Sequence, residues 1–318
     1  MVRRRAVLRG AFALAAGSAL TGTAGSTSAT AEQELLAPYD AGDVAAVQTT
    51  ITGRLDPEAV AAVALPDALA TPLSTLRERF DALSLADLGP VRGSLALESD
   101  RLVGGGARAD ADFDPDELRA DLDSASFRAV DASAERDYFR APDGPFALGV
   151  DATSIVVGYG AQAMAHATAA AGTRSATTWT RRLGRVARAI DGESRAVARL
   201  GSSTRTAASD RLADGPEWLS TVLDATARVG VGVTVGEDRT RLSYGLDLDP
   251  STLDPSAAWD LLTAGTDRSP LRRQSIAWTN DTLVVRGDLP TDRLVTAHAA
   301  LLGAQTMEPT TSTPTASR

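Results

Sequence analysis

The sequence predicts an α+β protein made of two similar lobes that arose by internal duplication, each with the order β-β-α-β-β-α. Three observations lead to this prediction: an internal repeat, short turns between alternating strands, and helices that begin at Asp-Pro pairs. Hairpin turns join antiparallel strands, so we expect mostly antiparallel or mixed sheets. Helices are expected to cover one face of these sheets.

The first part of the repeat lies in residues 93–122 and again in residues 231–262. Each copy reads as a strand, a tight acidic turn, a second alternating strand, and a helix that follows Asp-Pro. Asp114-Pro115 and Asp254-Pro255 place a capping aspartate before a proline at the first helical position. Repetition of such a pattern indicates a copied structural unit.

The second part of the repeat aligns residues 147–171 with residues 276–302. Both stretches read as a strand, a short turn, a strand and a helix. The two histidines of the chain, His166 and His298, fall in the same helix of the two copies. A structural role shared by both copies is therefore the preferred interpretation of these histidines.

Other elements are expected outside the aligned stretches. A strand and a helix begin the first half in residues 49–63, and leading helices precede the copies at Pro72–Leu83 and Pro216–Ala227. Residues 179–190 form an amphipathic helix whose apolar face carries Leu183, Val186, Ala187 and Ile190. The boundary between the halves is expected between Ala171 and Gly215.

These patterns divide the chain into four parts. Residues 1–31 are expected to be a signal peptide, residues 32–172 the first repeat, and residues 173–304 the second repeat with its leading helices. Residues 305–318 are rich in Thr, Ser and Pro, which predicts a disordered tail.

The N-terminal segment has the features of an export signal. Arg4-Arg5-Ala6-Val7-Leu8 resembles the twin-arginine consensus, and Ala29-Thr30-Ala31 fits a cleavage site before Glu32. The apolar stretch from Ala11 to Leu20 is shorter than the roughly 20 residues that span a bilayer. Leu20-Thr21-Gly22-Thr23 resembles a lipobox, but Thr23 replaces the cysteine that lipidation requires.

The composition indicates adaptation to high salt. All 32 basic residues are arginine, and the acidic residues number 41. The predicted leader carries four arginines and no acid, so the mature chain has 28 basic and 41 acidic residues, a net charge of −13. Molar salt shortens the Debye length to about 3 Å, which screens such self-repulsion. Leader and composition together resemble twin-arginine-exported proteins of halophilic archaea, which implies a location outside the cytoplasm.

Charge and composition also exclude some functions. The net negative field disfavours binding to nucleic acid. Cysteine is absent, which excludes disulfides, thiol nucleophiles and Cys-rich metal sites. No G-x-S-x-G, H-E-x-x-H or Walker sequence occurs. We therefore assign no catalytic, cofactor-binding or metal-binding residues.

Two motifs resemble binding sites. Gly158-Tyr159-Gly160 resembles a dinucleotide-binding turn, but the helix after it is followed by no strand and the first acid is Asp191. A tight strand-to-helix turn is the preferred interpretation. Alternating aspartates at 110, 112, 114 and 116 approach EF-hand spacing, but Pro115 occupies the position that needs glycine. A solvated acidic face is preferred there.

Further residues have one structural and one functional interpretation. Arginines 181, 182, 185 and 188 on one helix either pair with the acidic remainder of the protein, which we prefer, or bind an anion or a sulfated polymer. The four tryptophans, at 179, 218, 259 and 278, either belong to the core, which we prefer, or line a sugar cleft. Asn280-Asp281-Thr282 is a glycosylation sequon at an expected hairpin turn.

No motif identifies an activity, and three hypotheses remain. The first is a non-enzymatic binding or scaffolding module of the cell envelope or extracellular space, whose partner lies at the cell surface or outside the cell. The second is an extracytoplasmic solute- or polysaccharide-binding protein with its ligand between the halves. The third is a carboxylate-dependent hydrolase, which requires two perturbed carboxylates in one pocket.

Overall fold

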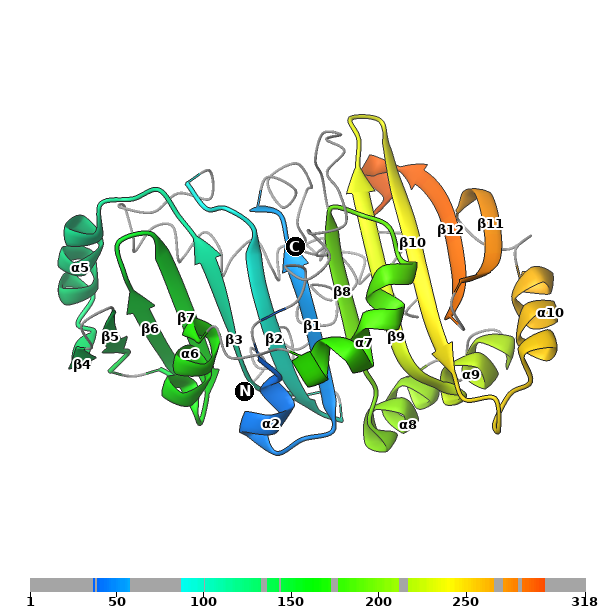
Figure 1. Cartoon of the computed structure of the whole chain (residues 1–318), viewed down its shortest axis with the longest axis horizontal. Coiled ribbons are helices and arrows are strands. Elements are labelled where there is room, and N and C mark those ends of the chain that lie inside the picture. The colour runs from blue at the N-terminus through cyan, green and yellow to red at the C-terminus, as the bar shows by residue number, and fades with distance from the viewer. Residues whose placement is uncertain are drawn as a thin grey trace, which may run out of the picture.

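Twelve strands form one continuous sheet in which every neighbouring pair is antiparallel (Figure 1). The computed structural model describes residues 37, 39–57, 87–99, 101–132, 136–142, 144–172, 177–211, 217–265, 271–279 and 282–294. The strand order is β11-β12-β10-β9-β8-β1-β2-β3-β7-β6-β5-β4. The strands are β1 Thr49–Leu55, β2 Val91–Glu98, β3 Arg101–Asp110, β4 Arg128–Ala132, β5 Asp137–Arg140, β6 Phe146–Val150, β7 Ser154–Gly160, β8 Ser194–Arg199, β9 Thr226–Val235, β10 Arg239–Leu248, β11 Arg272–Thr279 and β12 Thr282–Pro290.

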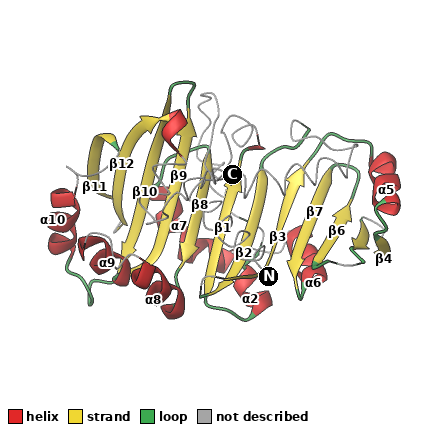
Figure 2. Cartoon of the chain, turned by 180° about the vertical axis from the view of Figure 1, so that it is seen from behind, coloured by secondary structure: helices red, strands yellow, loops and turns green. Residues whose placement is uncertain are grey.

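Seven α-helices are present in the described part of the chain, on both sides of the sheet (Figures 1 and 2). They are α2 Ala41–Ala45, α5 Pro115–Ser124, α6 Ala163–Ala171, α7 Thr177–Ala189, α8 Ser202–Arg211, α9 Glu217–Asp224 and α10 Pro255–Gly265. A short 3₁₀-helix, η3 Thr291–Arg293, follows β12. The fold class predicted from the sequence, α+β with antiparallel strands, is therefore confirmed.

The expected hairpins and helix starts are present in both of the aligned stretches. β2 and β3 pair as a hairpin, as do β9 and β10, β6 and β7, and β11 and β12. The Asp114 carboxylate accepts hydrogen bonds from the backbone N–H groups of Asp116 and Glu117 at the start of α5. The Asp254 carboxylate accepts from Ser256 and Ala257 at the start of α10. These caps satisfy N–H groups that have no partner within a helix.

The expectation that helices cover one face of the sheet is wrong. On β7, Val156 packs against α6, whereas Ile155 belongs to the cluster of α5 with Leu118 and Leu122. Consecutive residues of a strand point to opposite faces, so α5 and α6 lie on opposite sides of the same strand. Because this strand is apolar on both faces, both faces require cover.

The segment expected to hold the boundary contains regular structure that the sequence did not reveal. β8 pairs with β1 on one side and β9 on the other, so it joins the strands of the two halves. The polar stretch after Gly201 forms helix α8. β4 and β5, at the edge of the sheet, were also not expected.

Helix α7 confirms the predicted amphipathic pattern. Leu183, Val186, Ala187 and Ile190 are buried together with Val197 of β8. β1 and α9 are also found where they were expected, although β9 begins at Thr226, inside the range assigned to the leading helix. The predicted leader, the helix at 72–83, His298, Asn280 and the C-terminal tail lie outside the described residues.

Two glycines let α6 lie directly on β7. A Cβ atom at Gly158 would lie 1.9 Å from the carbonyl oxygen of Ala163 and 2.6 Å from the amide nitrogen of Ala167. Gly160 has φ of +102°, which L-residues rarely adopt, and it turns the chain from β7 into α6. The close approach buries Ala163, Ala167 and Ala170 against the sheet.

We predict that Gly158→Ala destabilises the protein by about 3 kcal/mol, since the added methyl group meets backbone atoms that cannot move aside. Denaturant unfolding followed by circular dichroism measures this change. The matched control is Gly184→Ala in α7, where an added Cβ lies 3.6 Å from the Arg188 side chain. The control should stabilise the helix by up to about 1 kcal/mol. Equal effects of the two substitutions would contradict the prediction.

Candidate functional site

The glycine motif at Gly158 and Gly160 lies in an antiparallel setting. β7 is antiparallel to both of its neighbours, β3 and β6. A dinucleotide-binding turn requires parallel strands joined through a helix. The geometry supports the interpretation of this motif as a tight strand-to-helix turn.

The alternating aspartates contact different groups and do not converge on one site. Asp110 forms an ion pair with Arg108 at 3.4 Å, and Asp116 forms one with Arg119 at 2.5 Å. Asp114 caps α5. Among the described residues, no group of three or more His, Asp or Glu side chains is arranged to hold a metal ion.

His166 is a buried residue of α6 that contacts Tyr39. Its Nδ1 lies 3.0 Å from the Tyr39 hydroxyl oxygen, and the side chain is 1% exposed. Its Nε2 faces β3, where a Cβ at Gly104 would lie only 2.4 Å away. Burial lowers the pKa of His166, while burial and then the charge of Asp40 raise the pKa of Tyr39. His166 is thus a packed, hydrogen-bonded residue, and the role that it is expected to share with His298 stays a prediction.

The structure describes the side chains of two of the four arginines of α7. Arg185 and Arg188 are exposed, and Arg185 has an interaction partner. The side chains of Arg181 and Arg182 lie outside the described part of the chain. The preferred interpretation, ion pairing, therefore stays a prediction.

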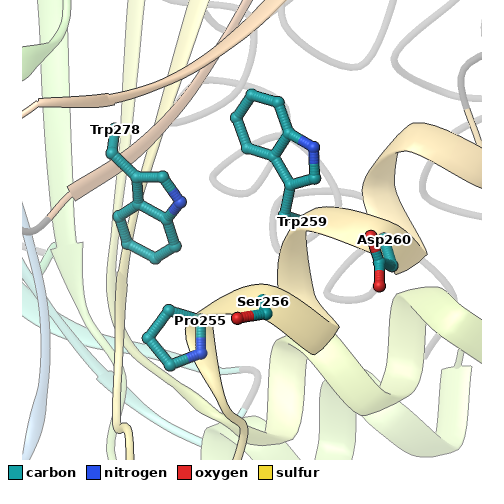
Figure 3. A pocket seen from close by; sticks show the side chains of 5 residues that line it. All are labelled: Pro255, Ser256, Trp259, Asp260 and Trp278. Carbon is teal, nitrogen blue, oxygen red and sulfur yellow. The ribbon is translucent and has the colours of Figure 1, made fainter.

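Two of the four tryptophans meet at a surface pocket of about 410 Å³ (Figure 3). Trp259 and Ser256 project from α10, and Trp278 projects from β11 across the pocket from Trp259. Pro255 and Asp260, also on α10, complete the lining. Trp278 is 39% exposed, so its indole ring presents a large apolar face to solvent.

The pocket is electronegative. Its described lining contains the Asp260 carboxylate and no basic side chain. At the adjacent start of α10, the backbone N–H of Ser256 is the main group that lowers the pKa of Asp254, and the Ser256 side chain and the N–H of Ala257 add to it. Asp254 is thus ionised at neutral pH and occupies the N–H groups that could otherwise attract an anion. The pocket suits neutral or cationic ligands.

Both Trp259 and Trp278 were candidates from the sequence, but the sequence did not predict that they lie close together. The residues are 19 positions apart, on a helix and on an edge strand. The preference for a core role holds for Trp218, which packs against Ala258, Leu262 and Leu283. Trp259 packs against the same cluster and also lines the pocket.

A pair of carboxylates lies elsewhere in the molecule, at the end of the β1–β8 pairing. Burial and then the nearby charge of Asp56 raise the pKa of Glu193. Neither residue lines the tryptophan pocket. Among its described lining residues the pocket holds one carboxylate, whereas hydrolysis of a glycosidic bond ordinarily needs two that flank the bond.

Comparisons with known proteins assign no family. No protein-family model matches the chain, and no curated protein matches it. Similar solved structures include crystal forms III, I and IV of TP0453, with TM-scores of 0.46, 0.44 and 0.45 and 9% sequence identity in each case. Each comparison covers 80% of this chain and 93% or 94% of the other. Within the described residues, no helix combines the length and hydropathy needed to span a bilayer.

We predict that His166 titrates below the ordinary histidine pKa of about 6.5, because burial disfavours its charged form. The unfolded chain then binds the proton more readily than the folded chain. The contribution to stability is therefore complete above about pH 6.5 and is lost as the pH falls below it. NMR titration of the ring signals measures the pKa, with His298→Gln to assign them. A midpoint at or above 6.5 would show that the ring is not buried in solution.

Proposed function

We propose that this chain is an exported, salt-adapted binding module of the cell envelope or extracellular space, built from a duplicated α+β unit and without enzymatic activity. The observation that carries the proposal is the pocket between Trp259 and Trp278. The leader and the acidic, lysine-free composition support export into a salt-rich medium.

The strand pairing supports the duplication. In the first half, β1, β2, β3, β7 and β6 follow one another across the sheet, and in the second half β8, β9, β10, β12 and β11 do so. In each half, a helix with an Asp-Pro start follows the third strand of this order. The two series run outward in opposite directions from the β1–β8 pair. Two similar lobes joined edge to edge would have this arrangement.

The lining of the pocket favours a neutral saccharide as ligand. A sugar ring presents an apolar C–H face that can stack on an indole, and its hydroxyl groups can bond to Ser256 and Asp260. The pocket lies within the second half, between α10 and β11, rather than between the halves. A surface site of this kind fits a binding module that contacts a polymer at the cell surface.

The hydrolase alternative has less support. Asp260 is the one carboxylate among the described residues that line the tryptophan pocket, and the carboxylate pair of Asp56 and Glu193 lies outside it. Binding without bond cleavage requires no second carboxylate at the pocket.

The proposal is tested by tryptophan fluorescence with neutral and sulfated oligosaccharides added to the full chain. Neutral ligands should quench the signal saturably. We predict that Trp259→Ala or Trp278→Ala weakens binding by about tenfold, since each removes one stacking surface.

Phe146→Ala is the matched control, because Phe146 is 42% exposed and lies on β6, in the other half of the sheet. It should leave binding unchanged. Equal losses in all three variants, or a preference of the pocket for sulfated ligands, would refute the proposed site. Release of reducing sugar by the wild-type chain would instead favour the hydrolase.

A further inference from the structure

Four arginines stand side by side across four neighbouring strands. Arg195 of β8 is opposite Arg54 of β1, Arg54 is opposite Arg92 of β2, and Arg92 is opposite Arg108 of β3. Residues directly opposite each other in antiparallel strands project to the same face, and strands are about 4.8 Å apart, so the row is about 14 Å long. Like charges in this arrangement repel and destabilise a sheet unless something of opposite charge lies among them.

The arginine row lies on the face that α6 and α7 also occupy. Val197, two residues after Arg195, packs against α7, and a Cβ at Gly106, two residues before Arg108, would meet the His166 carbonyl oxygen of α6. In Figure 1, α6 and α7 stand on either side of β1 and β2. All four arginines are partly exposed to solvent.

The two outer arginines are held by groups of the protein. Arg108 donates to the Asp110 carboxylate at 3.4 Å and to the Ala171 carbonyl oxygen, at the C-terminal end of α6, at 3.5 Å. Arg195 Nε donates to the Gly192 carbonyl oxygen at 2.6 Å. These contacts fix the ends of the row.

The two inner arginines lack such partners. Within the described part of the chain, no hydrogen bond or ion pair reaches the side chain of Arg54 or Arg92, and the Nε atom of each is buried without an acceptor. Asp110 lies two residues after Arg108 and pairs with it, whereas the corresponding neighbour of Arg92, two residues before it, is Pro90, which carries no charge. Among the described residues, the inner pair therefore has side-chain donors without acceptors, between two further positive charges.

The other end of the same face provides an internal comparison. There Arg199 of β8 is opposite Arg228 of β9, which is opposite Asp247 of β10. Arg228 pairs with Asp247, and Arg199 Nη2 lies 3.3 Å from the Asp40 carboxylate. Neighbouring arginines are thus neutralised by carboxylates of the chain at that end, whereas no described carboxylate forms an ion pair with the inner two arginines of the row.

We propose that the arginine row binds a sulfate or phosphate group between Arg54 and Arg92, with Arg195 and Arg108 extending the site toward a ligand that carries several such groups. The planar guanidinium offers paired donors that match two oxygens of such an anion. The site is separate from the tryptophan pocket, so it does not rest on the proposed saccharide binding. Contacts that are partly buried are also screened by salt much less than exposed ones.

Isothermal titration calorimetry on the full chain, in about 1 M KCl, tests the site with sodium sulfate, sodium phosphate and dextran sulfate, and with neutral dextran as the uncharged comparison. Arg92→Gln should weaken oxyanion binding by about tenfold. The matched control Arg101→Gln removes one exposed arginine from the β2–β3 hairpin outside the row and should leave binding unchanged. Trp259→Ala should also leave it unchanged. Tighter binding of inorganic phosphate than of dextran sulfate would identify a small anion as the ligand, and the reverse would identify a sulfated polymer.

A thermal melt without added oxyanion separates binding from a structural role. Removal of one charge from the row relieves repulsion, so Arg92→Gln should melt at a higher temperature than the wild type, whereas a structural arginine would lower the melting temperature when replaced. Arg54→Gln should likewise weaken oxyanion binding and raise the melting temperature, and it replaces Arg92→Gln in the test if that variant does not fold. The proposal is overturned if the wild type shows no saturable oxyanion binding, if Arg101→Gln weakens binding as much as Arg92→Gln, or if both row variants melt at lower temperatures.

Discussion

The antiparallel pairing of β1 with β8 is the contact on which the rest of the structure depends. Five residue pairs, from Thr50–Arg199 to Arg54–Arg195, join strands that are more than 130 residues apart in the chain. Gly53 permits this approach, since a Cβ there would lie 2.5 Å from the Arg195 carbonyl oxygen. Without this pairing, each half would expose an unpaired sheet edge to water and to other chains. The pairing also brings Arg195 next to Arg54, so the arginine row exists only in the joined sheet.

Close approach of helices to the backbone of the sheet is the second feature on which the fold depends. Gly158 lets α6 lie on β7, and Gly230 lies beneath Val186 of α7 and Ile190, the residue that follows this helix. The sequence around Gly158 resembles a nucleotide-binding motif because both structures need a strand, a tight turn and a helix in close contact. The direction of the neighbouring strands separates the two cases, and that direction is a property of the whole sheet. The glycines serve packing, and the candidate binding surfaces lie elsewhere.

Elements with a local signal could be predicted from the sequence, and those that depend on distant partners could not. The Asp114 cap and the amphipathic face of α7 are encoded within a few residues, and both are present as predicted. β8 has only a short apolar pattern between two arginines, and it is a strand because β1 and β9 flank it. Trp259 and Trp278 were recognised as candidates, but their meeting depends on how α10 packs beside β11. The arginine row is invisible in sequence because its members come from four separate strands.

Native-state hydrogen exchange tests most directly whether the β1–β8 pairing makes the two halves one cooperative unit. The amides of β1 and β8 should exchange only through global unfolding, with the same free energy as the amides of β3 in the first half and β10 in the second. That result would place the central pair among the most protected parts of the molecule. If β8, β9 and β10 instead open together at a lower free energy while β1, β2 and β3 stay protected, the halves are separate units and the β1–β8 pair does not hold the sheet together.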